Sequence, residues 1–361
     1  MKALIGILVM LSATLTATAS RAEMVLSPVQ TPQFCMQNFN AYGPIYAPDT
    51  YQRMEWIGSL LQAAPRCGVI QLQEVWNSSN IDQIENALKY NYQISSPNRD
   101  NKIGVMSLFD GDIKGAWTYQ FRINNLGGFL DEIRETFGVT KAFHIVQTRL
   151  PGIDEDFYFV NTHLHPTSTE IRITQILDIL KWRLQNPSLK MLMSGDFNAN
   201  EKSFERDFMM AVMGLHDSFA DALGGSYPPG YCSYCETNPH SWMPGNHMLD
   251  YIFVSNAGGA NSKIQAVAGE LNMRGPLRDP LSDHYGVRVS FKLVPGGVDS
   301  LTGSQWIQRR DKVLAVLSQA QQILVSYDDG DLDPYIAEIQ GLSAQIQSQQ
   351  GPYYQYFGQF R

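Results

Sequence analysis

Residues 191–200 read Met-Leu-Met-Ser-Gly-Asp-Phe-Asn-Ala-Asn, an apolar run that stops at a glycine and then presents Asp196 and Asn198. The apolar run predicts a buried strand, and the polar residues after it predict a loop at the end of that strand. Because side chains alternate along a strand, Asp196 and Asn198 should lie on the same side. Taken alone, the stretch is better explained by a strand and a turn in which Asp196 caps a helix.

Four other apolar stretches also end in acidic or histidine residues, and together they favour a functional interpretation. They are Gln-Leu-Gln-Glu-Val-Trp at 71–76, Val-Asn-Thr-His-Leu-His at 160–165, Met-Leu-Asp-Tyr-Ile-Phe at 248–253 and Ser-Asp-His-Tyr-Gly-Val at 282–287. Several strands that deliver such side chains to one edge of a sheet are typical of an active site. The sequence therefore predicts an active site along a sheet edge.

Apolar periodicity predicts the elements around these stretches. Strands are expected at 34–40, 68–76, 103–109, 141–148 and 156–163, with a hairpin around 150–155, and helices at 51–64, 81–90, 171–184 and 204–213. Glu74 ends an apolar strand, and since buried carboxylates are rare unless paired or metal-bound, it is a candidate metal ligand. His144, inside another predicted strand, is interpreted as a structural histidine.

Composition limits the classes of function. The chain has 361 residues, of which 44% are hydrophobic and 17% charged, which is enough to bury a core. The formal net charge is −8 and there is no run of Lys or Arg, which disfavours a protein whose main role is to grip nucleic acid. A nuclease stays open, because a metal ion can neutralise the single phosphate that is cut.

The first 22 residues predict a signal peptide. Lys2 precedes an apolar stretch from Ala3 to Leu15, and small residues that suit cleavage follow. A membrane anchor is the rival interpretation, but the apolar part is shorter than the ~20 residues that a spanning helix needs. We therefore expect the mature protein to be secreted or periplasmic.

Four cysteines fit an oxidising compartment without proving it. Cys232 and Cys235 lie in a loop and could close a small disulfide ring. A zinc half-site or a redox pair is the sharper interpretation of this spacing, but no second pair or thioredoxin-like context supports it. Cys35 and Cys67 either pair with each other or remain buried thiols.

Two further segments stand apart from the predicted strands. Residues 224–246 are rich in Gly, Pro and aromatic residues, which is typical of a lid or binding loop but equally of an inert, disulfide-tied loop. From residue 301, apolar residues at helical spacing, interrupted by an acidic break at 328–334, predict a helical hairpin. We expect it to dock on the preceding domain or on a second protomer, giving a homodimer.

The motifs, taken in order, resemble those of the endonuclease/exonuclease/phosphatase superfamily of metal-dependent phosphoesterases. They are Asn38, then Gln-Glu-Val-Trp, Thr-His-Leu, Gly-Asp-Phe-Asn, Leu-Asp-Tyr-Ile and Ser-Asp-His, spread over about residues 34–293. The resemblance implies an α+β fold, a four-layer sandwich of two mixed β-sheets with helices outside. With the other predictions it divides the chain into a signal peptide (1–22), a catalytic domain (23–295) and a C-terminal helical extension (296–361).

The same resemblance assigns candidate metal ligands. Glu74 resembles the principal Mg²⁺ ligand, Asn38 its assistant, and Asp283 an auxiliary carboxylate for the metal or for hydrogen bonding. Asn38 precedes a turn, where asparagine more often bonds the local backbone. Mg²⁺ is the expected cofactor, with Mn²⁺ or another divalent cation as alternatives.

The resemblance also assigns the catalytic residues. His163 resembles a donor to the phosphate, Asp196 and Asn198 the acidic and amide pair at the phosphorus, and His284 a catalytic histidine oriented by Asp250. The chemistry agrees, since an anionic phosphodiester requires both charge neutralisation and an activated nucleophile. A histidine held by a carboxylate suits a general base, but the sequence leaves the choice of base and acid open.

Within the superfamily, the sequence most resembles the neutral sphingomyelinase branch, because of residues 72–76, residues 162–165, the expected secretion and the acidic balance. The expected reaction is hydrolysis of sphingomyelin to ceramide and phosphocholine at a phospholipid membrane surface. Tyr231 and Trp242 are candidate aromatic contacts for a quaternary ammonium headgroup. The alternatives are a secreted nuclease of the same fold, then a phosphoinositide phosphatase, and last a non-catalytic scaffold.

Overall fold

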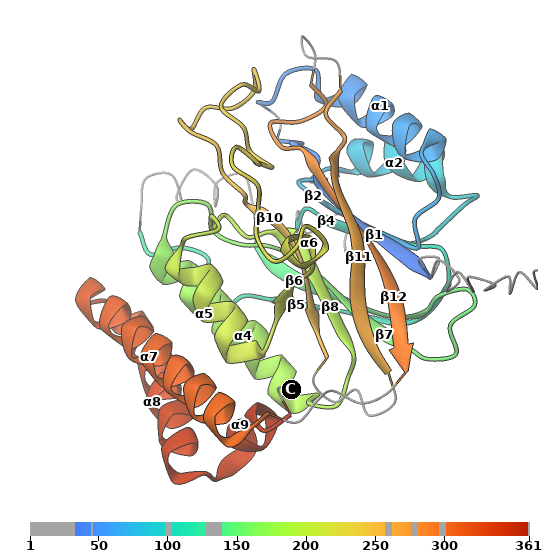
Figure 1. The fold of residues 1–361 in the computed structure, drawn as a ribbon. Coiled ribbons are helices and arrows are strands. Elements are labelled where there is room, and N and C mark those ends of the chain that lie inside the picture. The colour runs from blue at the N-terminus through green and yellow to red at the C-terminus, as the bar shows by residue number, and fades with distance from the viewer. Residues whose placement is uncertain are drawn as a thin grey trace, which may run out of the picture. The chain divides into compact units, whose positions relative to one another are not determined.

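The computed structural model describes residues 33–44, 46–97, 103–127, 139–256, 262–275, 280–295 and 301–359 (Figure 1). The predicted signal peptide lies outside these residues, so it stays a prediction. Among the helices that the structure describes, none has the length and hydrophobicity needed to cross a bilayer.

Two mixed six-stranded sheets form the centre of the fold. In the order in which they pair, the first sheet contains β11 (Ser262–Asn272), β12 (Gly286–Pro295), β1 (Phe34–Asn40), β2 (Val69–Gln73), β4 (Val105–Phe109) and β3 (Gln93–Ser95). The second contains β5 (Asp112–Gln120), β6 (Ala142–Arg149), β7 (Phe157–His163), β8 (Met191–Asp196), β10 (Asp250–Ser255) and β9 (His216–Asp217). Every residue of β1, β2, β4, β8 and β10 is buried, which explains the high apolar content of these strands.

Helices cover the outer face of each sheet. Helices α1 (Thr50–Ala63) and α2 (Ser78–Leu88) share a hydrophobic cluster with β1, β2 and β4. Helices α4 (Thr169–Gln185) and α5 (Phe204–Met213) pack with the second sheet, and the short α6 (Ser218–Ala222) contacts β10 and β11 (Figure 1). The predicted four-layer α+β sandwich is confirmed.

The elements that the sequence did not predict lie mostly at sheet edges. β5 is an edge strand whose residues are all exposed or half-buried, and β11 is an edge strand of similar character. Because β5 has no buried residue and β11 has only one, neither sequence carries a run of apolar residues that predicts a strand. The predicted hairpin at 150–155 is confirmed, because β6 and β7 pair antiparallel around it.

Three C-terminal helices pack on α4 and α5, which cover the second sheet. α7 (Gly303–Tyr327) and α8 (Asp333–Ser348) form the predicted hairpin, with the 3₁₀ turn η1 (Gly330–Leu332) between them, and α9 (Gly351–Phe357) follows. α7 lies against α5, and the Tyr356 hydroxyl donates to the Met213 carbonyl at 2.7 Å (Figure 1). The hairpin therefore docks on the same chain. The boundary at 296 falls outside the described residues, and the boundary and homodimer stay predictions.

The cysteines form two disulfides. Cys35 in β1 is joined to Cys67 before β2, with Cα atoms 5.0 Å apart, and Cys232 is joined to Cys235, with Cα atoms 5.3 Å apart. The structure thus decides both pairings that the sequence left open.

His144 of β6 is a buried histidine held by two hydroxyl groups. Its Nε2 lies 2.8 Å from the Ser95 hydroxyl and its Nδ1 lies 2.9 Å from the Thr118 hydroxyl. Burial lowers the pKa of His144 from 6.5 to about 4. A hydrogen bond to the Trp117 backbone acts in the opposite direction but is the smaller effect. A neutral histidine with hydroxyl partners has a structural role, as the sequence predicts.

This pKa predicts acid sensitivity of folding. Between the folded pKa of about 4 and the unfolded value of 6.5, only the unfolded chain binds the proton, so His144 stabilises the fold above 6.5 and loses this effect as pH falls. Between about pH 7.5 and 4.5 we expect the free energy of unfolding to fall by about 2.5 kcal/mol more in wild type than in His144→Gln. Urea titrations at both pH values measure this difference, and equal pH dependence in the two proteins would contradict it.

Candidate active site

Side chains from both sheets meet at one edge of the sandwich. Asn40, Glu74, His163 and Asp196 lie at or just beyond the carboxyl ends of β1, β2, β7 and β8, whereas Asp250 begins β10 and His284 precedes β12. β1 is parallel to β2 and β7 is parallel to β8, so these ends point the same way. β10 and β12 run antiparallel to their neighbours, so their amino ends lie at the same edge.

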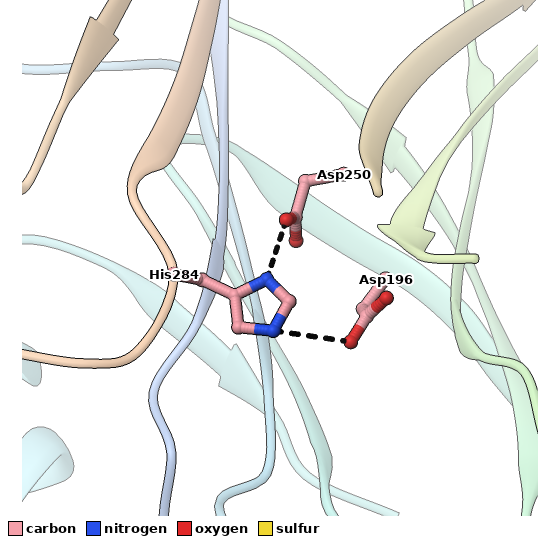
Figure 2. A group of neighbouring side chains, drawn as sticks. All are labelled: Asp196, Asp250 and His284. Atoms are coloured by element: carbon pink, nitrogen blue, oxygen red, sulfur yellow. Dashed lines mark hydrogen bonds and ion pairs between the residues drawn. The ribbon is translucent and has the colours of Figure 1, made fainter. Parts of the chain in front are cut away.

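Asp250, His284 and Asp196 form a buried row of contacts. The His284 Nδ1 donates to Asp250 Oδ2 at 2.7 Å, and its Nε2 lies 3.7 Å from Asp196 Oδ2 (Figure 2). A carboxylate at Nδ1 fixes the tautomer and orientation of the ring. Nε2 is therefore the atom at which His284 can exchange a proton with a substrate or with Asp196.

The pKa values of this row are strongly shifted. Burial lowers the pKa of His284, but Asp250, Asp283 and Asp196 outweigh it and raise the pKa well above 6.5. Burial raises the pKa of Asp196 to about 6; Asp250 acts in the same direction and His284 in the opposite one. Burial also raises the pKa of Asp283 to about 7, with repulsion from Glu74 and Asp196. Such perturbed groups in one site are a feature of catalytic centres.

Glu74 and His163 complete the site beside Asp196. The His163 Nε2 lies 3.4 Å from Asp196 Oδ2 and 3.9 Å from Glu74 Oε1. Glu74 has a φ of 59°, in the left-handed region that non-glycine residues seldom adopt. Strained residues of this kind cluster at functional sites, where the surrounding fold holds them.

The asparagine that reaches the carboxylates is Asn40, not Asn38. The Asn40 amide donates to Asp196 Oδ2 at 3.0 Å and to Glu74 Oε1 at 3.3 Å. Asn38 lies deeper between the sheets, where its carbonyl oxygen accepts from Gln73 and Ser194. Both asparagines face the same side of β1, so only the pairing of β1 with β2 decides which one lies beside Glu74. The interpretation of Asn38 as the metal's assistant is corrected to Asn40.

Asn38 instead supports the row of Asp250, His284 and Asp196, which we call the catalytic row after its proposed role. Its amide donates to Asp250 Oδ1 at 3.4 Å and to the Gly195 carbonyl at 3.2 Å. Because Asp250 Oδ2 holds His284, the second oxygen is thus also satisfied by a buried partner.

Asn198 and Asp283 flank this group. Asn198 has a φ of 50°; its backbone nitrogen donates to Asp196 Oδ1 at 2.9 Å and its amide donates to the Leu164 carbonyl. Asp283 Oδ1 lies 3.9 Å from His284 Nε2 and accepts from the Ser282 hydroxyl. Both residues therefore lie beside the catalytic row.

The aromatic residues near the carboxylates are Trp76 and Tyr42. The Trp76 ring lies 6.1 Å from the His163 ring. Burial raises the pKa of Tyr42 to about 12, and repulsion from Asp283, Tyr46 and Glu74 acts in the same direction. The sequence motif contained Trp76 but gave it no role, and Tyr42 was missed because nothing in a turn at 41–44 signals proximity to Glu74.

The two aromatic residues proposed from the sequence lie elsewhere. Tyr231 has its ring 6.2 Å from that of Phe219 in α6. Trp242 is 70% exposed, and its backbone nitrogen donates to the Tyr234 hydroxyl. Neither ring has a described contact with Glu74, Asp196 or His284, and their role in substrate binding stays a prediction.

The donor set suits a divalent cation. Glu74 Oε2 is buried and has no hydrogen-bond partner among the described residues. An unsatisfied carboxylate oxygen near further acids is the type of ligand that Mg²⁺ or Mn²⁺ takes. Asp196, Asp250 and His284 also form a group whose ligand atoms lie within 4.8 Å. Since Asp250 and His284 already bond each other, we place the candidate metal at Glu74, with Asp283 as a neighbouring acid.

Comparison with known families decides the identity of the fold. A profile of the Endonuclease/Exonuclease/phosphatase family matches residues 38–284. The chain belongs to this family. The match covers the second sheet, most of the first sheet apart from β12 and the start of β1, and every strand end of the site, so the superfamily resemblance of the motifs is confirmed.

Solved structures of the endonuclease/exonuclease/phosphatase fold are similar at low sequence identity. A functionally unknown conserved protein from Enterococcus faecalis has a TM-score of 0.58 at 15% identity, covering 72% of this chain and 99% of its own. A mannosyl-6-phosphatase from Bacteroides thetaiotaomicron has 0.54 at 16%, covering 72% and 99%. TDP2 from D. rerio, complexed with a single-strand DNA product, has 0.55 at 16%, covering 72% and 98%. These likenesses show the fold alone.

No curated protein sequence matches this chain significantly. Membership in the endonuclease/exonuclease/phosphatase family places the chain among phosphoester hydrolases. The choice of substrate must be argued from the site.

Proposed function

We propose that the protein is an exported, divalent-metal-dependent phosphodiesterase that hydrolyses sphingomyelin to ceramide and phosphocholine. The observation that carries the hydrolase assignment is the meeting of Glu74, Asp196 and the Asp250–His284 pair at one sheet edge. Phosphodiester hydrolysis requires a cation site and a proton-transfer group. Here the carboxylate with an unsatisfied oxygen would supply the first, and the histidine bound to a carboxylate would supply the second.

Each residue of the site has a separate proposed role in the reaction. A metal held by Glu74, with Asp283 beside it, would neutralise charge on the phosphate. His163 would donate to a phosphate oxygen, and so would the Asn198 amide through the hydrogen that it does not give to the Leu164 carbonyl. His284, oriented by Asp250, exchanges a proton at Nε2. Asp196 lies between His163 and His284 and can position the attacking water or take its proton.

Proton transfer in this site uses two groups with displaced pKa values. Asp196, with a pKa raised to about 6, can exchange a proton near neutral pH. The surrounding carboxylates raise the pKa of His284 well above 6.5, which favours the protonated ring and suits stabilisation of the anionic transition state or donation to the leaving oxygen. Asp196 and His284 are therefore the pair between which acid and base roles are divided.

Several features support a choline-headed lipid as the substrate. The Gln-Glu-Val-Trp and Thr-His-Leu-His motifs favour the sphingomyelinase branch, and a net charge of −8 disfavours a polyanionic strand. Trp76 and Tyr42 bring aromatic rings next to His163 and the site carboxylates. Aromatic faces attract quaternary ammonium groups, so these two rings join Tyr231 and Trp242 as proposed headgroup contacts. Each already lies near one cation, since Arg53 is 5.1 Å from the Tyr42 ring and Lys141 Nζ is 5.8 Å from the Trp76 ring, so a headgroup would share the ring with it.

A comparative assay tests the substrate. We expect the purified mature protein to release phosphocholine from sphingomyelin vesicles with Mg²⁺, to lose this activity with a chelator, and to regain it on addition of Mg²⁺ or Mn²⁺. DNA and phosphoinositide vesicles are assayed in parallel. Cleavage of DNA without lipid hydrolysis would replace the proposal by the nuclease alternative, and failure on all three would refute the proposed substrate class.

A further inference from the structure

The loop at 224–246 contains a tight turn closed by the Cys232–Cys235 disulfide, which we call the Cys232–Cys235 turn. The two residues that it brackets, Ser233 and Tyr234, are 0% and 1% exposed, whereas Tyr231 and Glu236 on either side are exposed. A loop that buries two residues completely must hold them against something specific, and here that is the catalytic row.

One contact of this turn fixes the start of β10. The Ser233 hydroxyl oxygen accepts from the backbone nitrogen of Asp250 at 3.1 Å and from that of Leu249 at 2.9 Å. The backbone of Asp250 therefore enters its strand tied to the turn, and its carboxylate is positioned from there.

The other contacts fix His284. The Tyr234 ring packs against the imidazole in a T-shaped arrangement, with centroids 5.1 Å apart and an interplanar angle of 71°. The backbones of these two residues form an isolated antiparallel bridge, and the nitrogen of Tyr285 donates to the Ser233 carbonyl at 2.6 Å. The turn thus bonds the segments on both sides of the Asp250–His284 hydrogen bond.

The rest of the loop anchors Tyr234 from behind. Its backbone exchanges two hydrogen bonds with His247, at 2.9 and 2.8 Å. Its hydroxyl oxygen accepts from the backbone nitrogens of Trp242 and Met243 at 2.6 and 3.2 Å. The ring on His284 is consequently held at both ends.

We propose that the Cys232–Cys235 turn is a positioning element for the Asp250–His284 pair, in which Ser233 and Tyr234 are positioning residues and the disulfide holds both in their contacts. The proposal rests on the catalytic role of this pair, stated above. It does not depend on which phosphodiester the protein hydrolyses.

Removing each disulfide in turn tests the proposal, because the two variants should differ in opposite ways in kcat and in melting temperature. Cys35 and Cys67 are 32 residues apart and Cys232 and Cys235 only 3, so the first disulfide restricts the unfolded chain much more. We expect Cys232→Ser/Cys235→Ser to lower kcat at least about tenfold while KM and the melting temperature change little. The matched Cys35→Ser/Cys67→Ser control should lower the melting temperature and leave kcat nearly unchanged below it. Unchanged kcat in the first variant, or an equal loss in both, overturns the proposal.

A spectroscopic measurement separates this proposal from the proposed function, because it needs no substrate. The Nδ1 proton that His284 donates to Asp250 should give a downfield proton resonance, identified by its absence in His284→Ala. We expect the resonance in wild type and in the Cys35→Ser/Cys67→Ser control, and expect it broadened or lost in Cys232→Ser/Cys235→Ser. An unaltered resonance in the latter overturns the positioning role even if the wild-type protein fails to hydrolyse sphingomyelin.

Replacements of Tyr234 test the ring contact itself. Tyr234→Phe keeps the ring against His284 and should keep most of the wild-type kcat. Tyr234→Leu removes the T-shaped contact and should lower kcat with little change in KM. Equal kcat for the two variants contradicts a role of the ring in positioning His284, and the melting temperature of each shows whether folding is retained.

Discussion

Replacement of His284 by alanine is expected to lower turnover by about 10³-fold or more while the fold is retained. The reason is that Nε2 of His284, the atom proposed to exchange the proton, lies beside Asp196, and Asp250 holds the ring through Nδ1 at 2.7 Å. Asp250→Asn should give a related loss of about 10²-fold to 10⁴-fold, because an amide can present a donor to Nδ1 and favour the wrong tautomer.

Another buried histidine of the same chain, His144, provides the control for this prediction. His144→Gln replaces another buried histidine, so it should alter acid stability and leave turnover at neutral pH nearly unchanged. Circular dichroism and thermal unfolding verify that His284→Ala is folded, and kcat and KM are measured with the best substrate of the comparative assay. Near-normal turnover in His284→Ala would show that proton transfer occurs elsewhere.

Replacement of Glu74 by glutamine is expected to remove most metal-dependent activity, by about 10²-fold or more. The substitution keeps the shape of the side chain but removes the charge of the carboxylate whose Oε2 has no hydrogen-bond partner among the described residues. Because a cation in this place depends on that charge, Mn²⁺ affinity should fall at least about tenfold.

Metal binding is measured directly, so that this prediction does not depend on turnover. Calorimetric or paramagnetic titration with Mn²⁺ compares wild type, Glu74→Gln and the surface control Glu55→Gln on the exposed side of α1. We expect wild type and the surface control to bind alike. Wild-type Mn²⁺ affinity in Glu74→Gln would move the metal away from this carboxylate, towards the group of Asp196, Asp250 and His284.

The buried strands were predictable because burial on both faces selects apolar residues along the strand. The apolar runs of β7 and β8 lie in largely or wholly buried strands and stop at His163 and Asp196. In β10 the order is reversed, because Asp250 comes first and the apolar run follows it. β5 and β11 were missed, since edge strands with a wet face carry no such signal.

The correction from Asn38 to Asn40 marks the limit of periodicity. A two-residue shift along a strand keeps a side chain on the same face, so both asparagines satisfied the pattern equally. Their difference is the depth along β1, and that depth is fixed by the pairing of Asn40 with Gln73, next to Glu74. Tyr234 was missed for a related reason, because a loop that returns from elsewhere in the chain brings its ring against His284.

By itself, the sequence determined the family, the two-sheet core and the acids and histidines at the strand ends, because burial and chemistry are properties of short segments. Only the tertiary structure decided which asparagine serves Glu74, which cysteines pair, which aromatic rings approach the site, and that the Cys232–Cys235 turn touches His284. These are contacts between residues far apart in the chain or between strands in register. Their free energy depends on atomic distances that no local pattern encodes.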